Sequence, residues 1–186
     1  MTGPAAALHY GIAEAGKVHA VAGRHDEALR HYREAMRLAV EGGAEEVFFR
    51  HYTQCVLESL ERLGHFDEVL AFCERAEGHY EANPPPHELA VLDRATHWER
   101  RGAVLLQADR GDEARDALEQ AVSLAGKGRL PLAETLLGWV RRGLRVDARR
   151  LRAEQERREY FVVRKDSLDP SRAVELPPGV GQPAMR

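Results

Sequence analysis

The chain has 186 residues, of which 44% are hydrophobic, 31% charged and only 6% aromatic, and its formal charge is −3. This length suits one domain, or one domain with a tail, and the absence of a long apolar run excludes a transmembrane helix. The N-terminus has no basic segment followed by an apolar stretch, so we expect a cytoplasmic protein. Cys55 and Cys73 cannot build a disulfide framework. Of the 27 basic residues 24 are Arg, which is typical of a GC-rich bacterial genome.

Three segments share one pattern, a tight turn followed by the start of a helix. They read Ala22-Gly-Arg-His-Asp-Glu-Ala28, Leu63-Gly-His-Phe-Asp-Glu-Val69 and Ala108-Asp-Arg-Gly-Asp-Glu-Ala114. Small and apolar residues follow each segment at spacings of three and four, as one face of a helix requires. The helix dipole favours the Asp-Glu pair in the first turn. Each segment therefore predicts the start of a helix.

A second amphipathic stretch precedes each of these helices. Gly16 stands four residues after Ile12, and Gly102 stands four residues after Trp98. Each unit is thus predicted to be a helix, a turn and a second helix. Three consecutive prolines at 84–86 mark the connector to the third unit, because proline cannot continue a helix.

With Gly16 and Gly102 in the first helices, and Ala28 and Ala114 opening the second ones, residues 9 to about 125 resemble the tetratricopeptide repeat (TPR) family. The resemblance implies an all-α fold: a right-handed α-solenoid of three TPR-like helix pairs over 4–126, followed by a capping helix and an extended tail. In such pairs, small residues let the two helices approach closely. Large side chains fill the remaining gaps, here Tyr32, Trp98 and Leu118.

The chain departs from the family pattern in spacing and in its second unit. Matching turns at Gly23, Gly64 and Asp109 are 41 and 45 residues apart, whereas the family repeats every 34 residues. Leu57 and Val69 replace small residues in the second unit. We expect that unit to pack at a different angle.

Residues 130–159 are predicted to form an Arg-rich capping helix, or two short helices interrupted near Gly143. Residues 131–165 carry ten basic and five acidic side chains, whereas residues 1–130 carry 15 and 22. A solenoid needs a cap with a polar outer face, which favours the capping role. A basic binding face is the alternative, formed by Arg141, Arg142, Arg145, Arg149, Arg150, Arg152, Arg157 and Arg158.

Residues 160–186 are predicted to be an extended or flexible tail. Tyr160, Phe161, Val162 and Val163 are strand-like, and four prolines follow in the last twenty residues. One interpretation is a second interaction element, in which these four residues add as a strand to an exposed edge, with Leu176 or Val180 as a further anchor. An unstructured extension is the other.

Neither catalytic nor metal-binding chemistry is evident. The chain has no glycine-rich phosphate loop and no nucleophile motif. Its nearest histidine pairs are six or eight residues apart, and such spacings do not converge on one face of a helix. We therefore expect no enzyme, no metal and no cofactor.

The resemblance also implies a concave groove lined by the first helix of each unit. The matching positions are Tyr10, Ala13, Lys17, Ala20 and Val21, then His51, Gln54, Glu58, Glu61 and Arg62, then Thr96, Glu99, Ala103, Leu106 and Gln107. Such a groove is apolar at one end and acidic in the middle, which favours a protein or peptide partner with apolar anchors and basic residues. A merely solvated face is the alternative.

These observations favour a non-catalytic protein-protein interaction module, an adaptor, scaffold or chaperone that binds a segment of a partner protein. Small three-repeat members of the family include chaperones for secreted bacterial proteins. A nucleic-acid or anionic-surface binder that uses the Arg-rich helix ranks second. No membrane insertion is expected, and a homo-oligomer stays open.

Overall fold

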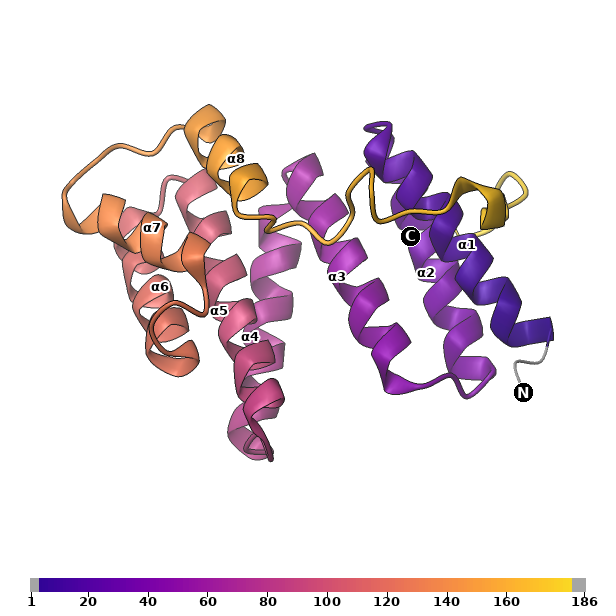
Figure 1. Cartoon of the computed structure of the whole chain (residues 1–186), viewed down its shortest axis with the longest axis horizontal. Coiled ribbons are helices and arrows are strands. Elements are labelled where there is room, and N and C mark those ends of the chain that lie inside the picture. The colour runs from indigo at the N-terminus through magenta and orange to yellow at the C-terminus, as the bar shows by residue number, and fades with distance from the viewer. Residues whose placement is uncertain (1–3, 182–186) are drawn as a thin grey trace. The chain divides into compact units, whose positions relative to one another are not determined.

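The computed structural model describes residues 4–181, with side chains from Leu8 onward. Regular structure in this range is entirely helical, which confirms the all-α class. The helices are α1 (Pro4–Val21), α2 (His25–Glu41), α3 (Glu46–Leu63), α4 (Phe66–Ala82), α5 (Glu88–Gln107), α6 (Gly111–Ala125), α7 (Pro131–Arg141) and α8 (Ala148–Arg157), with a 3-10 helix η1 (Pro170–Arg172) near the end (Figure 1). None of these helices combines the length and the apolar character that crossing a bilayer requires.

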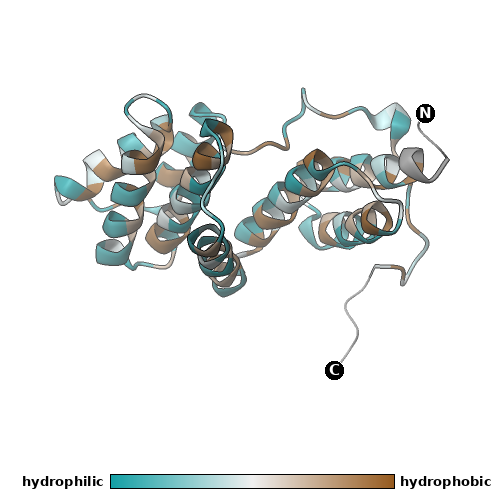
Figure 2. Cartoon of the chain, turned by 90° about the horizontal axis from the view of Figure 1, so that it is seen from below, coloured by the Kyte–Doolittle hydropathy of each residue, from teal (hydrophilic) through white to brown (hydrophobic). Residues whose placement is uncertain are grey.

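The predicted helix starts are confirmed. The Asp-Glu pairs lie in the first turns of α2, α4 and α6, where the positive end of the helix dipole attracts their negative charge. Gly64 ends α3 in the left-handed conformation that glycine adopts without strain. Helices with a hydrophobic side and a hydrophilic side are visible in Figure 2.

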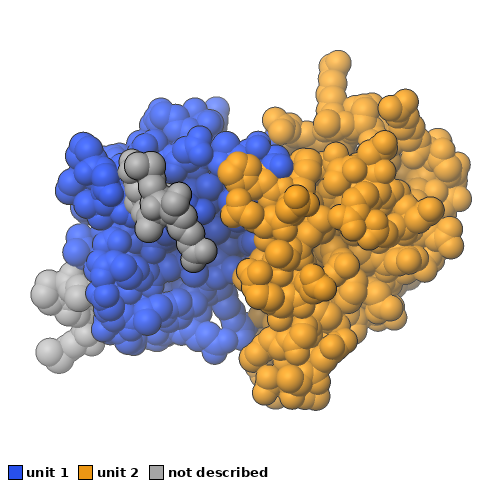
Figure 3. Space-filling model, turned by 180° about the vertical axis from the view of Figure 1, so that it is seen from behind, with its two compact units in different colours: residues 1–64, 161–186 blue, residues 65–160 orange. Residues whose placement is uncertain are grey.

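The chain divides into two compact units (Figure 3). Unit 1 comprises the chain up to Gly64 together with the segment from Phe161 onward, and unit 2 comprises residues 65–160. The boundary falls between α3 and α4. It therefore lies inside the second predicted helix pair, the one in which Leu57 and Val69 replace small residues.

Each unit contains one hairpin in which a glycine lets two helices approach closely. A Cβ atom added to Gly16 of α1 would lie 2.6 Å from Cε1 of Tyr32 in α2. One added to Gly102 of α5 would lie 2.6 Å from Cγ of Leu118 in α6. The large side chains of the second helices thus lie directly against the backbone of the first, as the sequence predicts.

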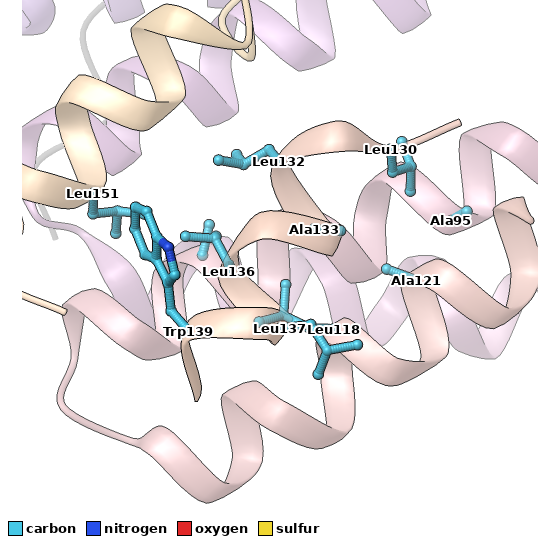
Figure 4. Close-up of a cluster of buried hydrophobic side chains, with 11 residues drawn as sticks. Ala95, Leu118, Ala121, Leu130, Leu132, Ala133, Leu136, Leu137, Trp139 and Leu151 are labelled. Carbon is cyan, nitrogen blue, oxygen red and sulfur yellow. The ribbon is translucent and has the colours of Figure 1, made fainter. Parts of the chain in front are cut away.

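In unit 2, an apolar cluster joins α7 and α8 to the α5–α6 hairpin (Figure 4). Its buried members are Ala95, Ala103, Leu118, Ala121, Leu130, Leu132, Ala133, Leu136, Leu137, Trp139 and Leu151. The helical stretch is broken between Arg141 and Ala148, near Gly143 as expected, so the second of the two predicted alternatives holds.

In unit 1, residues 161–181, hereafter the tail segment, run along the helices in an extended conformation that η1 interrupts (Figure 1). The expectation that residues 160–163 form a strand is wrong, because this part of the described chain has no strand assignment. The described part of unit 1 has only helices, so it offers no sheet edge for a strand to join. The last five residues of the predicted tail, 182–186, lie outside the described residues.

Candidate functional site

The tail segment begins on two buried carboxylates of unit 1. The backbone N–H groups of Val162 and Val163 donate to Oε1 and Oε2 of Glu58 in α3, the second at 3.2 Å. The N–H of Asp169 donates to Oε2 of Glu14 in α1 at 2.9 Å. Lys17 donates to the other oxygen of Glu14 at 2.6 Å, so this buried carboxylate is fully paired.

The second half of the tail segment is bound in the same way by α1 and α2. Val174 N–H donates to the carbonyl of Gly11 at 2.9 Å. Leu176 N–H donates to Nε2 of His31 at 3.2 Å. Nη1 of Arg30 donates to two tail carbonyls, those of Pro177 and Val180, each at 2.8 Å. The helices of unit 1 thus bind backbone groups near the start, the middle and the end of the tail segment, and every extended chain possesses such groups.

Gly11 makes room for this segment on α1. A Cβ atom at this position would lie 2.6 Å from Cγ2 of Val174 and 2.9 Å from the carbonyl oxygen of Arg172. Glycine inside a helix is less stable than alanine by roughly 0.5–1 kcal/mol. The close approach of the tail backbone supplies a structural reason for glycine here.

Side chains of the tail segment add a few anchors. The ring of Phe161 is buried, and the guanidinium of Arg62 lies 4.0 Å from its centroid. Leu176 packs against the buried cluster that contains Ile12 and Tyr52. Val180, the alternative anchor considered from the sequence, is 37% exposed and contributes through its carbonyl instead.

The predicted acidic lining of the groove is not open to solvent. Glu58, Glu61 and Glu99 are only 4%, 3% and 7% exposed. Glu58 holds the tail segment, and Oε2 of Glu99 accepts the N–H of Ala133 in the first turn of α7 at 2.8 Å. Burial raises the pKa of Glu99. Glu58 and Glu99 therefore bind segments of their own chain.

The other predicted groove residues are divided between the two units. Lys17 is buried in unit 1. Half-buried positions are Tyr10, Val21, His51, Gln54 and Arg62 in unit 1, and Leu106 and Gln107 in unit 2. Of this set, Arg62 contacts the tail segment directly, and Arg172 of the tail lies 5.8 Å from the ring centroid of Tyr10.

Two histidines and a tail carboxylate form a cluster that the sequence analysis missed. Nε2 of His19 lies 3.0 Å from Oε2 of Glu175, and Nε2 of His31 lies 3.1 Å from the same oxygen. His19 and His31 also converge with Glu27, with one ligand atom of each lying within 4.8 Å of the others. The sequence analysis considered only histidines close together on one helix, whereas the hairpin brings together His19 of α1 and His31 of α2.

A signal for this pair was present in the sequence. In an antiparallel hairpin, positions just after a contact residue on the first helix lie near positions just before its partner on the second. His19 follows Gly16, and His31 precedes Tyr32, which packs on Gly16. The register of the antiparallel α1–α2 hairpin therefore implies their proximity. Nothing in the sequence indicated that Glu175 lies beside these histidines.

Several side chains of the Arg-rich region contact other residues of unit 2. Arg157 and Arg158 both pair with the buried carboxylate of Glu154, at 2.6 and 2.8 Å. Arg150 lies over the ring of Trp139 at 4.2 Å, and Arg141 pairs with Glu119 at 3.0 Å. Half of the eight arginines proposed for an anionic ligand thus already contact side chains of unit 2.

The two cysteines are buried, and desolvation raises the pKa of the Cys55 thiol. A buried thiol with a raised pKa is a poor nucleophile, so Cys55 acts as a packing group. Comparison of the chain with protein-family models, with curated proteins and with solved structures finds no match. The arguments about function therefore rest on the geometry of the chain itself.

Proposed function

We propose that the protein is a non-catalytic interaction module of the TPR-like solenoid class, an adaptor, scaffold or chaperone, and that unit 1 binds an extended segment of a partner protein. The observation that carries the proposal is the set of hydrogen bonds from α1, α2 and α3 to backbone groups of the tail segment. The partner segment takes the place of the tail segment on this surface.

Backbone recognition gives affinity for extended chains in general, whereas side-chain pockets select among them. On this surface the selective positions are those of Phe161, Glu175 and Leu176. A matching partner has an aromatic residue and, further along, an acidic residue followed by an apolar one. We no longer expect the partner to need basic residues, because Glu58 and Glu99 already accept backbone N–H groups.

The tail segment competes with any such partner. A segment joined to its own binding surface has an effective concentration of about the millimolar order, so a free peptide displaces it only when it binds more tightly or when the tail is weakened. This makes the tail segment an internal competitor that restricts binding to strong or locally concentrated partners.

The experiment uses a fluorescent peptide with the sequence of residues 161–181, added to full-length chains in the presence of a metal chelator. A chain carrying Phe161→Ala and Leu176→Ala holds its own tail weakly and is expected to bind the peptide at least about tenfold more tightly than the unaltered chain. The matched control carries Val40→Ala and Leu89→Ala, which replace apolar residues that are 65% and 68% exposed.

Fluorescence anisotropy measures the binding. Tight binding by the first variant and weak binding by the control and the unaltered chain support the proposal. Equal binding by all three, or no binding to the first variant, contradicts it.

A further inference from the structure

The cluster on the α1–α2 hairpin has the spacing of metal ligands. Zinc binds imidazole nitrogen at about 2.0–2.1 Å and carboxylate oxygen at about 2.0–2.2 Å, so tetrahedral ligand atoms lie about 3.3–3.5 Å apart. The two Nε2 atoms of His19 and His31 lie 3.0 and 3.1 Å from Oε2 of Glu175. Both separations are within a few tenths of an ångström of this spacing, so each histidine nitrogen is placed to share one ion with the Glu175 carboxylate.

The hydrogen bonds of His31 leave its Nε2 without a hydrogen. Nδ1 of this fully buried ring lies 2.8 Å from the main-chain carbonyl of Glu27, an acceptor, so Nδ1 carries the hydrogen. The N–H of Leu176 donates to Nε2 and so occupies its single lone pair. A metal ion bound at Nε2 therefore takes the place of this N–H, beside Oε2 of Glu175, which lies 3.1 Å from Nε2.

The surroundings supply a further ligand and an outer shell. Glu27 converges with the two rings, and Arg30 holds its carboxylate at 2.8 Å. The contact of His31 Nδ1 with a carbonyl is the outer contact that orients metal-binding histidines in general. At His19, exposed Arg24 donates to Nδ1 at 3.0 Å. Metal binding at Nε2 moves the hydrogen of His19 to Nδ1 and turns Arg24 away.

We propose that His19, His31 and Glu175 bind one Zn²⁺ ion, with Glu27 as the fourth ligand. Two imidazoles and two carboxylates suit zinc, whereas Mg²⁺ and Ca²⁺ prefer oxygen ligands alone. The ligands come from α1, α2 and the tail segment, so the ion fastens the tail to the hairpin. This inference requires no partner protein and stands apart from the proposed function.

The test is calorimetric titration of the tag-free, full-length chain with ZnCl₂. One equivalent is expected to bind. Glu175→Gln, at a side chain that is 62% exposed, and His19→Ala are each expected to weaken binding at least about tenfold. The matched control is Glu68→Gln, which alters the exposed His65–Glu68 pair of α4, also 3.0 Å apart, and leaves zinc binding unchanged.

Circular dichroism verifies that each variant keeps its helices. Hydrogen exchange of residues 170–181 other than Leu176, with and without zinc, reports the fastening of the tail. Slower exchange with zinc in the unaltered chain, lost in Glu175→Gln, supports the site. Failure of the unaltered chain to bind zinc overturns it. Equal binding by Glu175→Gln and Glu68→Gln also overturns it. Either failure leaves the peptide experiment unaffected, because that experiment is run with a chelator.

Discussion

Unit 1 and unit 2 contain the same kind of helical hairpin, but a different kind of chain segment packs on the hairpin in each unit. In unit 2, helix α7 packs on the α5–α6 hairpin through leucines such as Leu132 and Leu136. In unit 1, an extended segment lies on α1 and α2 and is held mainly through its backbone. Apolar packing depends on particular side chains, whereas backbone hydrogen bonds do not. The covering of unit 1 therefore depends less on particular side chains, which is why we propose this face of unit 1 as the binding surface.

Two buried glutamates, one in each unit, show the same difference between apolar packing and backbone hydrogen bonding. Glu99 binds an N–H at the start of a helix whose own apolar face is buried, so that contact is one among many. Glu58 binds two N–H groups of a segment that buries few side chains. The loss of Glu58 is thus expected to affect tail docking more than the loss of Glu99 affects α7.

The largest effect is expected for Leu136→Ala in unit 2. Removing this fully buried side chain leaves a cavity and costs about 2–5 kcal/mol of unfolding free energy. Urea unfolding followed by tryptophan fluorescence reports on unit 2, because Trp98 and Trp139 both belong to it. Leu89→Ala, at an exposed side chain, is the control. A cost below about 1 kcal/mol means that apolar packing does not hold α7.

Gly16→Ala and Gly102→Ala test the hairpins that the two units share. Each added methyl group clashes with Tyr32 or Leu118 and is expected to cost about 1–3 kcal/mol, measured by thermal unfolding. Gly78→Ala and Gly138→Ala are matched controls, because no atom lies near the added methyl group in these helices. They are expected to stabilise the chain by roughly 0.5–1 kcal/mol. If all four variants behave alike, the close approach of the paired helices is not what these glycines provide.

His97 is expected to make unit 2 sensitive to acid. Burial, helped by the charge of Arg100 and opposed by that of Glu77, lowers the pKa of His97 to about 4 in the folded chain. Its ordinary pKa is 6.5, so between pH 6.5 and 4 the unfolded chain takes up a proton that the folded chain does not, and stability falls. Allowing for partial exposure, we expect a loss of about 2 kcal/mol at pH 4.

His97→Leu removes this titration, and it also removes a buried Nδ1 that has no hydrogen-bond partner. Urea unfolding at pH 7 and pH 4, followed by tryptophan fluorescence, is expected to show a smaller loss for the variant than for the unaltered chain. The same loss in both chains contradicts the assignment.

The sequence predicted those features that local patterns determine. Acidic first turns located the starts of α2, α4 and α6, and Gly16 and Gly102 indicated where large side chains pack. The docking of the tail segment was not predictable in this way, because the backbone groups that carry it are the same in every sequence. Burial of Glu58 follows from that docking and was equally hidden.

The long-range cluster was hidden for a second reason. His19 and His31 are twelve residues apart, and Glu175 is 144 residues beyond His31, so their meeting depends on two separate packing events. Spacing along the chain finds ligands on one helix. Ligands on three different segments require the register of the hairpin and the path of the tail together.

The central claim, that α1 carries an extended segment bound through its backbone, is tested most directly by hydrogen exchange at Val174 and Leu176. The substitution Gly11→Ala puts a methyl group 2.6 Å from Val174 while improving the helix propensity of α1. We predict that these amides are protected in the unaltered chain and in Gly78→Ala, and that they exchange at least about tenfold faster in Gly11→Ala with no loss of helix. Unprotected amides in the unaltered chain, or equal protection in all three chains, would contradict the claim.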